Sequence, residues 1–446
     1  MKWKWKLIVI FLLVNIIIIV VGSSYSLLDN RPAVDAPLSL SRERTFNVRD
    51  FGAMGDGIQD DASAIQLALD KAAQYRPAAV YLPAGQYKVS TSKPLTVPAN
   101  VTVFGQGEQT VIQADSDRFG WQLLRIHGDH ITLNKLVLDG RRSVNRVIVV
   151  EPGSMDVRLS RVTITGASQS EDRDSPYHDQ VVSGIIILGD TARIELDDID
   201  IYDIHAPYGD KIARGIYATT TWNSREKPPR QVSVTHSRIR KVGPAKDGDC
   251  IYFEDQGKEA VGATAIHSDS VISGNIFSGC AKRAIKLFAD GVTVSDNDID
   301  NTGMVANMFA GISAYGDDIT IEGNSIGGTG SYYAAVEIGA SVEVQRVHIV
   351  GNTIQMGELS RQKDTTGIRV GSIVDFVIAN NRIEHGERAI WIWQDAVNGL
   401  VRNNRIYVPA GGGIDLTKQH ADDIRSNIRI ENNVIKSKHD VIEEGE

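Results

Sequence analysis

The sequence predicts an all-β fold, a right-handed parallel β-helix (solenoid) with an N-terminal capping helix, in one domain over residues 45–446. A short pattern centred on asparagine recurs about every 26 residues, within the range of solenoid repeats. A second, strand-like pattern recurs between its copies. After Ala73 no stretch has a helical period long enough to supply the crossover helices of a competing α/β fold.

The residues before this domain resemble an export segment. A basic start is followed by an apolar run from Leu7 to Val21 and by small residues, which is typical of a signal peptide. Residues 1–22 are therefore predicted to be a signal peptide or, because no clear cleavage site follows, a membrane anchor. Residues 23–44 are predicted to be a linker, and the domain is expected outside the cell, secreted or anchored.

The capping helix is predicted directly after Asp60 and Asp61, which supply an N-cap. Ile65, Leu69 and Ala72 lie at helical spacing with Ala68 and form an apolar stripe. A solenoid needs a cover over its open end, so we expect this helix to lie there.

The asparagine pattern marks the turns of the solenoid. An amide in the same place of successive turns can hydrogen-bond to its copy and satisfy the backbone at a bend, so these asparagines are predicted to be structural. Four earlier turns carry Leu136, Val162, Ile199 and Ser237 at this place, which brings the predicted number of turns to eleven. The asparagines are Asn275, Asn297, Asn324, Asn352, Asn381, Asn404 and Asn433.

The second pattern is a small residue, an apolar residue, a variable residue and usually another apolar one. Alternation at period two buries the apolar residues and turns the variable ones outward. Stacked turn upon turn, the outward residues form a strip of aromatic, cationic and carboxylate side chains, a composition typical of a groove for an acidic saccharide. The strip is predicted to run Ile186, Tyr217, Tyr252, Lys286, Ser313, Glu337, Arg369, Trp391, Asp415, with Thr219, Glu254, Phe288, Tyr315 and Trp393 two residues further along their strands.

The net charge limits the classes of molecule that the chain can bind, and the cysteine content limits its disulfides. The net charge is −9, and no Lys/Arg run occurs outside the first residues, so nucleic acid is excluded as a partner and a polysaccharide is expected. The two cysteines, Cys250 and Cys280, allow one disulfide but no framework. We expect a monomer.

Residues 46–90 contain the run Asp50-Phe-Gly-Ala-Met-Gly-Asp-Gly57, the Asp60-Asp61 pair and Tyr81-Leu-Pro-Ala-Gly85. In this order the segments resemble the N-terminal signature of the pectate lyase-like superfamily, which includes polygalacturonase-like enzymes, mannuronan epimerases and phage tailspikes. The resemblance implies a right-handed β-helix. It does not imply one activity, because members of this fold differ in function.

The spacing between turns indicates where a site lies. Three consecutive intervals, from Val162 to Asn275, span 37, 38 and 38 residues, whereas the later intervals span 22 to 29. The extra residues are expected in loops at Glu171–Gln180, Thr219–Arg230 and Glu254–Val261, and long loops gathered in one zone commonly wall a site. His178 and His205 lie in this zone and are predicted to be surface residues.

Two segments in this zone resemble polygalacturonases. Asp249-Cys250-Ile251 is similar to their Asp-Asp-Cys-Ile strand, and Arg283-Ala-Ile-Lys286 is similar to their Arg-Ile-Lys. The resemblance implies that Asp249 acts as an acid/base and that Arg283 and Lys286 bind a uronate carboxylate. Gly248 replaces one aspartate of the family pair, and the family's Gly-His-Gly is absent.

Two chemistries are compatible with these residues. Inverting hydrolysis needs two carboxyl groups about 6.5 to 9.5 Å apart, which Asp249 could form with Glu254 or with Asp179; Glu254 and Glu337 lie three turns apart, roughly 14 Å. Proton abstraction beside a uronate carboxylate could instead use Tyr252 as the base, with its phenol pKa lowered by Lys286, and with Arg369 or a Ca²⁺ ion neutralising the carboxylate.

The sequence therefore predicts an enzyme that cleaves glycosidic bonds in a uronate-containing polysaccharide, by hydrolysis or β-elimination. The alternatives are a uronate epimerase and a non-catalytic saccharide-binding solenoid. No metal-ligand cluster or dedicated Ca²⁺ loop is visible, so Ca²⁺ is expected only for a lyase. The predicted catalytic residues are Asp249, Tyr252, Glu254 and Lys286, and the predicted substrate-binding residues are Tyr217, Arg283, Tyr315, Glu337, Arg369, Trp391 and Trp393.

Overall fold

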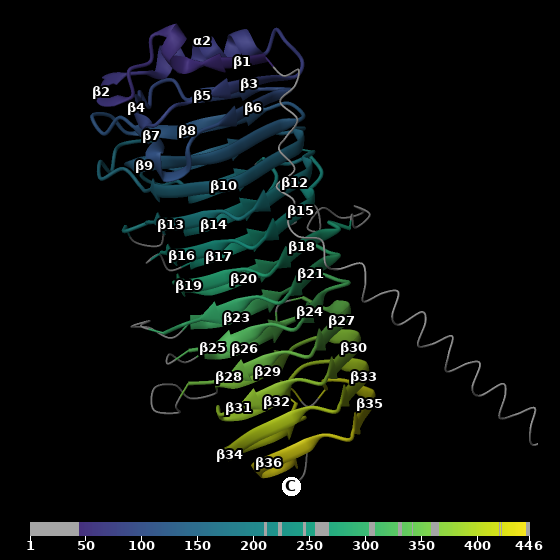
Figure 1. Cartoon of the computed structure of the whole chain (residues 1–446). Helices are drawn as coiled ribbons and strands as arrows, with labels where there is room; N and C mark the ends of the chain where they lie inside the picture. Colours follow the sequence, from purple (N-terminus) through teal and green to yellow (C-terminus); the bar gives the residue numbers. More distant parts are fainter. Residues whose placement is uncertain are drawn as a thin grey trace, which may run out of the picture. The chain divides into compact units, whose positions relative to one another are not determined.

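The computed structural model describes residues 44–208, 212–221, 225–243, 247–254, 267–302, 308–328, 332–340, 342–357, 365–418, 420 and 422–442. The predicted export segment and all of the linker except Arg44 lie outside these residues. Thirty-six strands pair in parallel into one sheet, which coils turn upon turn from α2 to β36 (Figure 1). The predicted parallel β-helix is confirmed.

Each turn of the coil contributes to three parallel ladders of strands. The first ladder precedes the asparagine position. It comprises β1 (Arg44–Asn47), β3 (Ala78–Tyr81), β6 (Val101–Phe104), the beginnings of β9 (Ile131–Val150) and β10 (Met155–Ala167), β12 (Ala192–Asp197), β15 (Arg230–Thr235), β18 (Ser270–Ser273), β21 (Val292–Ser295), β24 (Thr320–Glu322), β27 (Val344–Val350), β30 (Ile373–Ala379), β33 (Ala396–Arg402) and β35 (Arg425–Glu431).

The second ladder follows the asparagine position. It comprises β2 (Asp56–Asp60), β4 (Gly85–Val89), β7 (Thr110–Ala114), the middle of β9 and of β10, β13 (Asp200–Ile204), β16 (Arg238–Val242), β19 (Ile276–Cys280), β22 (Asp298–Asp300), β25 (Ser325–Gly327), β28 (Thr353–Gln355), β31 (Arg382–Glu384) and the beginnings of β34 (Arg405–Asp415) and β36 (Val434–Ile442).

The third ladder carries the outward strip predicted above. It comprises β5 (Leu95–Pro98), β8 (Gly120–His127), the end of β9, β11 (Val182–Ile187), β14 (Ile212–Ala218), β17 (Asp247–Phe253), β20 (Arg283–Leu287), β23 (Met308–Ala314), β26 (Tyr332–Ile338), β29 (Thr366–Val370), β32 (Arg388–Ile392) and the ends of β34 and β36.

The core is built from stacked branched side chains because parallel pairing places the same strand position directly above itself in every turn. The inward column of the third ladder consists almost entirely of isoleucine, and each member is fully buried. Its paired members are Ile148, Ile185, Ile216, Ile251, Ile285, Ile312, Val336, Ile368, Ile390 and Ile414.

The asparagine ladder is confirmed as a structural element. From Asn275 to Asn404 each side-chain amide donates to the Oδ1 of the next asparagine at 2.9–3.0 Å, and each Oδ1 from Asn297 onward also accepts the backbone N–H of the asparagine before it. The second amide proton goes to a backbone carbonyl of the preceding turn, as from Asn352 to Ile321 at 2.9 Å. The buried bend is thereby satisfied in every turn.

The residue directly before each asparagine position adopts the left-handed conformation in all eleven turns, from Lys135 (φ 55°) to Asn432 (φ 54°). Most of the later turns place glycine or asparagine there, the residues that accept this conformation most readily. Gly323 and Gly351 are therefore a second mark of the turns in the sequence, beside the asparagines.

The capping helix α2 (Ala62–Ala72) buries Ile65, Ala68, Leu69 and Ala72, as predicted, and lies over the first turns (Figure 1). The cap itself differs from the expectation. Asp60 Oδ1 accepts the N–H of Ala62 at 3.0 Å, whereas the Asp61 carboxylate accepts the N–H groups of Met54 and Gly55 in the preceding loop. The two short 3-10 helices are η1 (Val48–Phe51) and η2 (Gly107–Gln109).

The solenoid begins earlier than the eleven predicted turns. The strands from β1 to β7 already pair in the three ladders, although none of them carries the asparagine pattern. These early turns were not predicted because aliphatic residues and backbone turns stabilise them without an amide ladder.

Candidate functional site

The predicted outward strip forms a single register column of the third ladder. Consecutive members pair directly from β11 to β34. The predicted order is therefore confirmed along its whole length: Ile186, Tyr217, Tyr252, Lys286, Ser313, Glu337, Arg369, Trp391, Asp415. Burial and hydrogen bonds then divide this strip into three clusters.

The first cluster is centred on Glu254. Its Oε2 accepts hydrogen bonds from the hydroxyls of Tyr217 and Thr219, the latter at 2.6 Å, and its Oε1 accepts one from Tyr252 at 3.1 Å. The rings of Tyr217 and Tyr252 stack with centroids 5.4 Å apart. Two phenols of adjacent turns thus share one carboxylate, and Tyr217 and Glu254 remain partly exposed.

The expected lowering of the Tyr252 pKa is wrong. Burial raises the pKa of Tyr252, and the negative charge of Glu254 raises it further. The pKa of Tyr217 is raised for the same two reasons. Both phenols are therefore protonated near neutral pH, and each can lose its proton most directly to Glu254.

Lys286 lies one turn beyond Tyr252. Its Nζ is 4.2 Å from the Tyr252 ring centroid and 5.5 Å from that of Phe288. Burial lowers the pKa of Lys286, although Asp249 and Asp247 act in the opposite direction. Among the described residues no carboxylate forms an ion pair with it, so this half-buried ammonium is open to an external anion.

The second cluster is a buried ion network. Arg214 contacts Asp247 at 2.6 Å and Asp249 at 3.1 Å, and Arg283 contacts the same carboxylates at 3.3 and 3.5 Å. Asp247 also accepts an ion pair from Lys282 at 3.0 Å. Asp249 and Arg283 therefore form ion pairs with other side chains of the protein.

This network bears on the predicted acid/base role of Asp249. Its side chain is fully buried, and burial raises its pKa while Arg214 and Arg283 counter the shift. For Asp247 burial raises the pKa as well, but Arg214, Lys286 and Lys282 together outweigh burial and hold the pKa below its usual range. An Asp249 carboxyl in this setting does not reach a solvent-borne substrate, which weakens the hydrolytic pair.

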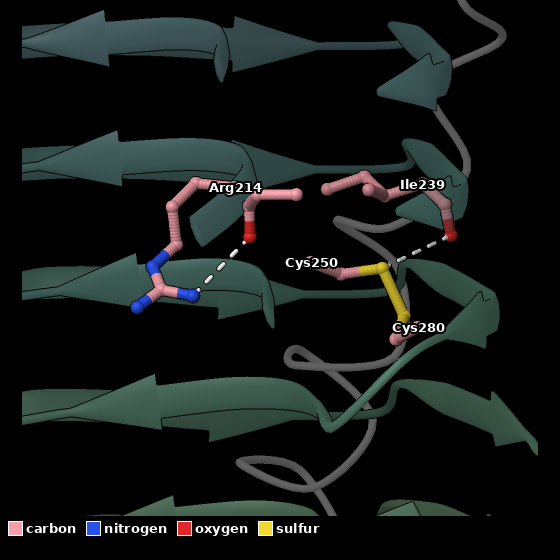
Figure 2. The surroundings of a disulfide bond; sticks show 5 residues. Arg214, Ile239, Cys250 and Cys280 are labelled. Carbon is pink, nitrogen blue, oxygen red and sulfur yellow. Dashed lines mark hydrogen bonds between the residues drawn. A yellow bond between two sulfur atoms is a disulfide. The ribbon is translucent and has the colours of Figure 1, made fainter. Parts of the chain in front are cut away.

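The disulfide that the sequence left open forms between Cys250 and Cys280. Figure 2 shows it beside Arg214, with the Cys250 sulfur 3.8 Å from the backbone oxygen of Ile239. Both cysteines are buried. The bond ties β17, which carries the network and the Glu254 cluster, to β19 of the second ladder.

The third cluster surrounds Glu337, whose carboxylate is 1% exposed. Tyr315 donates to its Oε2 at 2.6 Å, and Arg369 contacts its Oε1 at 3.4 Å. The Arg369 guanidinium lies over the rings of Trp393 at 4.1 Å and Tyr333 at 4.6 Å. These predicted substrate binders satisfy one another, and Trp391, 5.8 Å from Trp393, is the partly exposed member.

Three residues of the network, Arg214, Asp247 and Lys282, were not predicted from the sequence, although the sequence does hold a signal for Arg214. Arg214, Asp249, Arg283 and Arg388 each stand directly before the small residue that opens the second pattern. The backbone bends at that small residue, so the position before it also faces outward and forms a second column beside the first.

Of the three predicted loops, Glu171–Gln180 is described in full, whereas 222–224 and 255–261 lie outside the described residues. In the first loop His178 stacks on Tyr208 at 5.2 Å and its Nδ1 lies 2.7 Å from the backbone oxygen of Ser170. His205 pairs with Ser168 in an isolated bridge. Neither histidine contacts the three clusters.

Two surface hollows among the described residues lie away from the strip, one along Leu136, Val162 and Ser237 and one beside Arg158 and Arg193. Over the described ranges, no three His, Cys, Asp or Glu side chains are placed to hold a metal ion. No helix within the same ranges has the length and apolarity needed to span a membrane.

Comparison with protein families gives two matches. Residues 45–170 match a family described as rhamnogalacturonase A/epimerase, pectate lyase-like, and residues 339–440 match the right-handed β-helix region.

Two curated relatives come from Azotobacter vinelandii. Mannuronan C5-epimerase AlgE5 is 36% identical over 176 residues, covering 32% of this chain and 18% of the relative. Alginate lyase 7 is 45% identical over 74 residues, covering 15% of this chain and 9% of the relative. The chain thus spans less than a fifth of the length of these relatives.

Solved structures share the fold. The surface adhesin PfbA of Streptococcus pneumoniae superposes with a TM-score of 0.64 at 18% identity, over 85% of this chain and 93% of that one. The catalytic unit of a GH87 α-1,3-glucanase from Streptomyces thermodiastaticus gives 0.59 at 16% identity, over 92% and 71%.

Proposed function

Because this chain belongs to the pectate lyase-like superfamily of right-handed parallel β-helix proteins, we propose that it acts on a uronate-containing polysaccharide by removing the proton beside the uronate carboxylate. This step begins both β-elimination and C5 epimerisation. One observation carries the proposal: the ammonium of Lys286, unpaired among the described residues, stands one turn from the Tyr252–Glu254 hydrogen bond on the outward strip. The names of the two curated relatives, an epimerase of mannuronan and a lyase of alginate, support a uronate substrate.

In the proposed reaction Lys286 binds the uronate carboxylate. The Tyr252 oxygen takes the proton from C5 while its own O–H proton passes to Glu254 Oε1, 3.1 Å away. The C–H electron pair moves into the carboxylate, and the Lys286 charge stabilises the resulting enediolate. The intermediate then either expels the oxygen on C4, which takes up a proton from water as the chain is cleaved, or takes up a proton from water on the opposite face, which inverts C5; Glu254 returns its proton to solvent.

The raised pKa of Tyr252 explains why the carboxylate is needed. A phenol that is protonated near neutral pH is a poor base by itself, but it can pass a proton on to a hydrogen-bonded carboxylate. Tyr217 and Thr219 orient Glu254 for this transfer. The unpaired cation favours proton abstraction over hydrolysis, because the buried and ion-paired Asp249 is not placed as a hydrolytic acid or base.

The test is incubation of the full chain with polymannuronate, mixed alginate, polygalacturonate and pectin. Unsaturated uronates are followed by absorbance, new reducing ends chemically, and exchange at C5 by deuterium uptake from heavy water. On one acidic polymer we expect either deuterium at C5, if the reaction is an epimerisation, or unsaturated uronate ends, if it is an elimination. Reducing ends without unsaturation would mean hydrolysis, and binding without any change in the polymer would mean a saccharide-binding solenoid; both results contradict the proposal.

Variants assign the roles. Lys286→Ala, Tyr252→Phe and Glu254→Gln are each expected to reduce turnover by about a hundredfold or more, the typical contribution of a positioned acid/base group. Lys438→Ala is the matched control because Lys438 is an exposed lysine of β36, far along the coil from the strip's first cluster. Circular dichroism shows whether each variant is folded.

We also propose that the chain is exported, with residues 1–22 as signal or anchor. The buried disulfide supports this location, since disulfides persist chiefly in oxidising compartments. Fractionation of expressing cells, with N-terminal sequencing of the mature chain, distinguishes a cleaved signal from an anchor and from a cytosolic protein.

A further inference from the structure

We infer that Arg146, Trp121 and Tyr177 form a second anion-binding site on the same outward face, which takes the carboxylate of another uronate residue of the bound chain. This inference rests on the proposed uronate substrate. No role was predicted for these three residues from the sequence.

Arg146 belongs to the column that also holds the buried ion network. It pairs in register with Gln122 on one side and Ser183 on the other, and Ser183 pairs with Arg214. Arg214 and Arg283, further along this column, are both neutralised by Asp247 and Asp249. The neighbours of Arg146 in the column carry no charge.

The guanidinium of Arg146 lacks an anionic partner among the described residues. It forms no ion pair there, and its Nε is buried without a hydrogen-bond acceptor. Burial lowers the pKa of Arg146, and the electrostatic influence of Tyr217 and Glu151 acts in the other direction. A buried donor of this kind carries a desolvation cost that an incoming carboxylate would offset.

Aromatic rings hold this guanidinium in place. Its carbon lies 4.6 Å from the centroid of Trp121, a contact of the cation–π type. The ring of Tyr177 lies 5.7 Å from those of Trp121 and Phe119. All four side chains are partly exposed, so a ligand can reach them.

The loop that supplies Tyr177 is fastened to the same strand as Arg146. The buried amide of Asn145 donates to the backbone oxygens of Tyr177 at 2.9 Å and of Ser168 at 3.1 Å. The site is therefore assembled from β8, β9 and the Glu171–Gln180 loop before a ligand arrives. A planar guanidinium on a fixed aromatic wall suits a carboxylate, which can accept two parallel hydrogen bonds from it.

The distance to Lys286 identifies the ligand as a polymer. Four turns separate the Arg146 position from that of Lys286, which is roughly 19 Å at the spacing of adjacent strands. One uronate cannot reach both cations, so the two carboxylates must belong to separate residues of a chain that runs along the solenoid axis.

The experiment measures equilibrium binding of the full chain to oligogalacturonates and oligomannuronates of graded length, using calorimetry. Methyl-esterified pectin fragments serve as the uncharged probe. We expect Arg146→Gln to weaken binding of the longer acidic oligomers by about tenfold, the loss of one charge-assisted contact, and to leave the weak binding of the esterified fragments unchanged. Arg146→Lys should retain part of the affinity, and Arg405→Gln, an exposed arginine of β34, is the matched control.

Two results would overturn the inference: wild-type affinity of Arg146→Gln for every acidic oligomer, or an equal loss for acidic and esterified fragments. If the glutamine variant does not fold, the wild-type chain provides the test, because salt must weaken binding of long acidic oligomers more than of short ones. Turnover is recorded separately on the wild type. If binding depends on Arg146 but the wild type shows no turnover, the proposed reaction is rejected and this site is retained. If the wild type shows turnover but binding does not depend on Arg146, this site is rejected and the proposed reaction is retained.

Discussion

Asp247 joins three cations at the start of β17. It contacts Arg214, Lys282 and Arg283, and the first of these is almost completely buried. Removing one partner of a buried ion pair leaves the other charge without compensation, which costs more free energy than the intact pair contributes.

We predict that Asp247→Asn lowers the free energy of unfolding by about 3 kcal/mol at pH 7. Burial would raise the pKa of Asp247, but the combined attraction of Arg214, Lys286 and Lys282 lowers it in the folded state. Its stabilisation is thus fully present above the ordinary aspartate pKa of about 3.9 and is lost as the pH falls through the lower folded value. Denaturant unfolding at several pH values checks this, with the exposed Asp117→Asn as control. A difference between wild type and variant that stays constant down to pH 2 would contradict it.

Lys286 is expected to make the affinity for an acidic oligosaccharide depend on pH. Burial lowers the pKa of its ammonium, and the ammonium binds a carboxylate only while protonated. Affinity for an acidic oligosaccharide should therefore fall as the pH rises, at a lower pH than an ordinary lysine with a pKa of about 10.4 would show. In Lys286→Arg the charge persists, so the decline should move to higher pH. Titration calorimetry from pH 6 to pH 10 checks both expectations; identical profiles for the two proteins would exclude Lys286 as the binding cation.

At the scale of residues, the sequence predicted where side chains lie better than it predicted their protonation states. The column from Tyr217 to Asp415 followed from strand alternation, because parallel pairing leaves no freedom in the order of turns. The raised pKa of Tyr252 did not follow, since it depends on the Glu254 carboxylate that bonds to it and on burial by neighbouring turns. The burial comes from residues of neighbouring turns, such as Tyr217 and Lys286, which lie more than 30 positions away in the chain. Glu254 is only two positions from Tyr252, but strand alternation alone does not indicate that the two side chains hydrogen-bond.

The asparagine ladder is the element that sets each bend between the first and second ladders. Asn352 is fully buried and takes part in five hydrogen bonds to Asn324, Asn381 and Ile321. Asn352→Ala should reduce stability by about 3 kcal/mol, because backbone groups of two turns lose their partners in a buried place. Thermal unfolding measures the effect, and Gln355→Ala, an exposed amide in the next strand, serves as control. Equal midpoints for both variants would show that the ladder contributes nothing to stability.

The disulfide connects elements of two consecutive turns, β17 and β19. It closes a segment of 30 residues between Cys250 and Cys280, and constraining a loop of this size in the unfolded chain is worth about 3 kcal/mol. Cys280→Ala in the Cys250→Ala background should unfold at a lower denaturant concentration than the oxidised wild type and should be unaffected by reductant. The wild type should fall towards the variant when reduced. If reduction leaves its midpoint in place, the disulfide is not a stabilising element.

At the scale of elements the regular later half was the predictable part. The turns from Asn275 onward repeat one pattern at short spacing, whereas β1 to β7 lack it and were not counted. The turns of β1 to β7 are stabilised by aliphatic contacts and by hydrogen bonds of Asp60, Asp61 and Thr110. The stabilising residues therefore differ from turn to turn. Sequence periodicity therefore identifies only those turns that are stabilised by the same residue type at the same position.

For the whole molecule, the parallel register implies that, outside the loops, the chain can be shortened only by complete turns. Deleting residues 353–381 would join Asn352 to Arg382, which already occupies the same column as Thr353. This variant should fold with the strand content of the remaining turns. Deleting 353–366 removes half a turn and should prevent cooperative folding, since every later side chain would leave its column. Circular dichroism and thermal unfolding distinguish the two, and equal behaviour of both deletions would contradict the register argument.

The hydrogen bonds between successive asparagines all point the same way along the coil. Each amide and each backbone N–H in the ladder donates to the asparagine of the following turn, so a turn has its bend satisfied only once the next turn exists. During synthesis on the ribosome, the newest turn must therefore wait for about 26 more residues before its bend is complete. Folding of this half of the chain would then trail translation by one turn, growing from the capping helix toward β36.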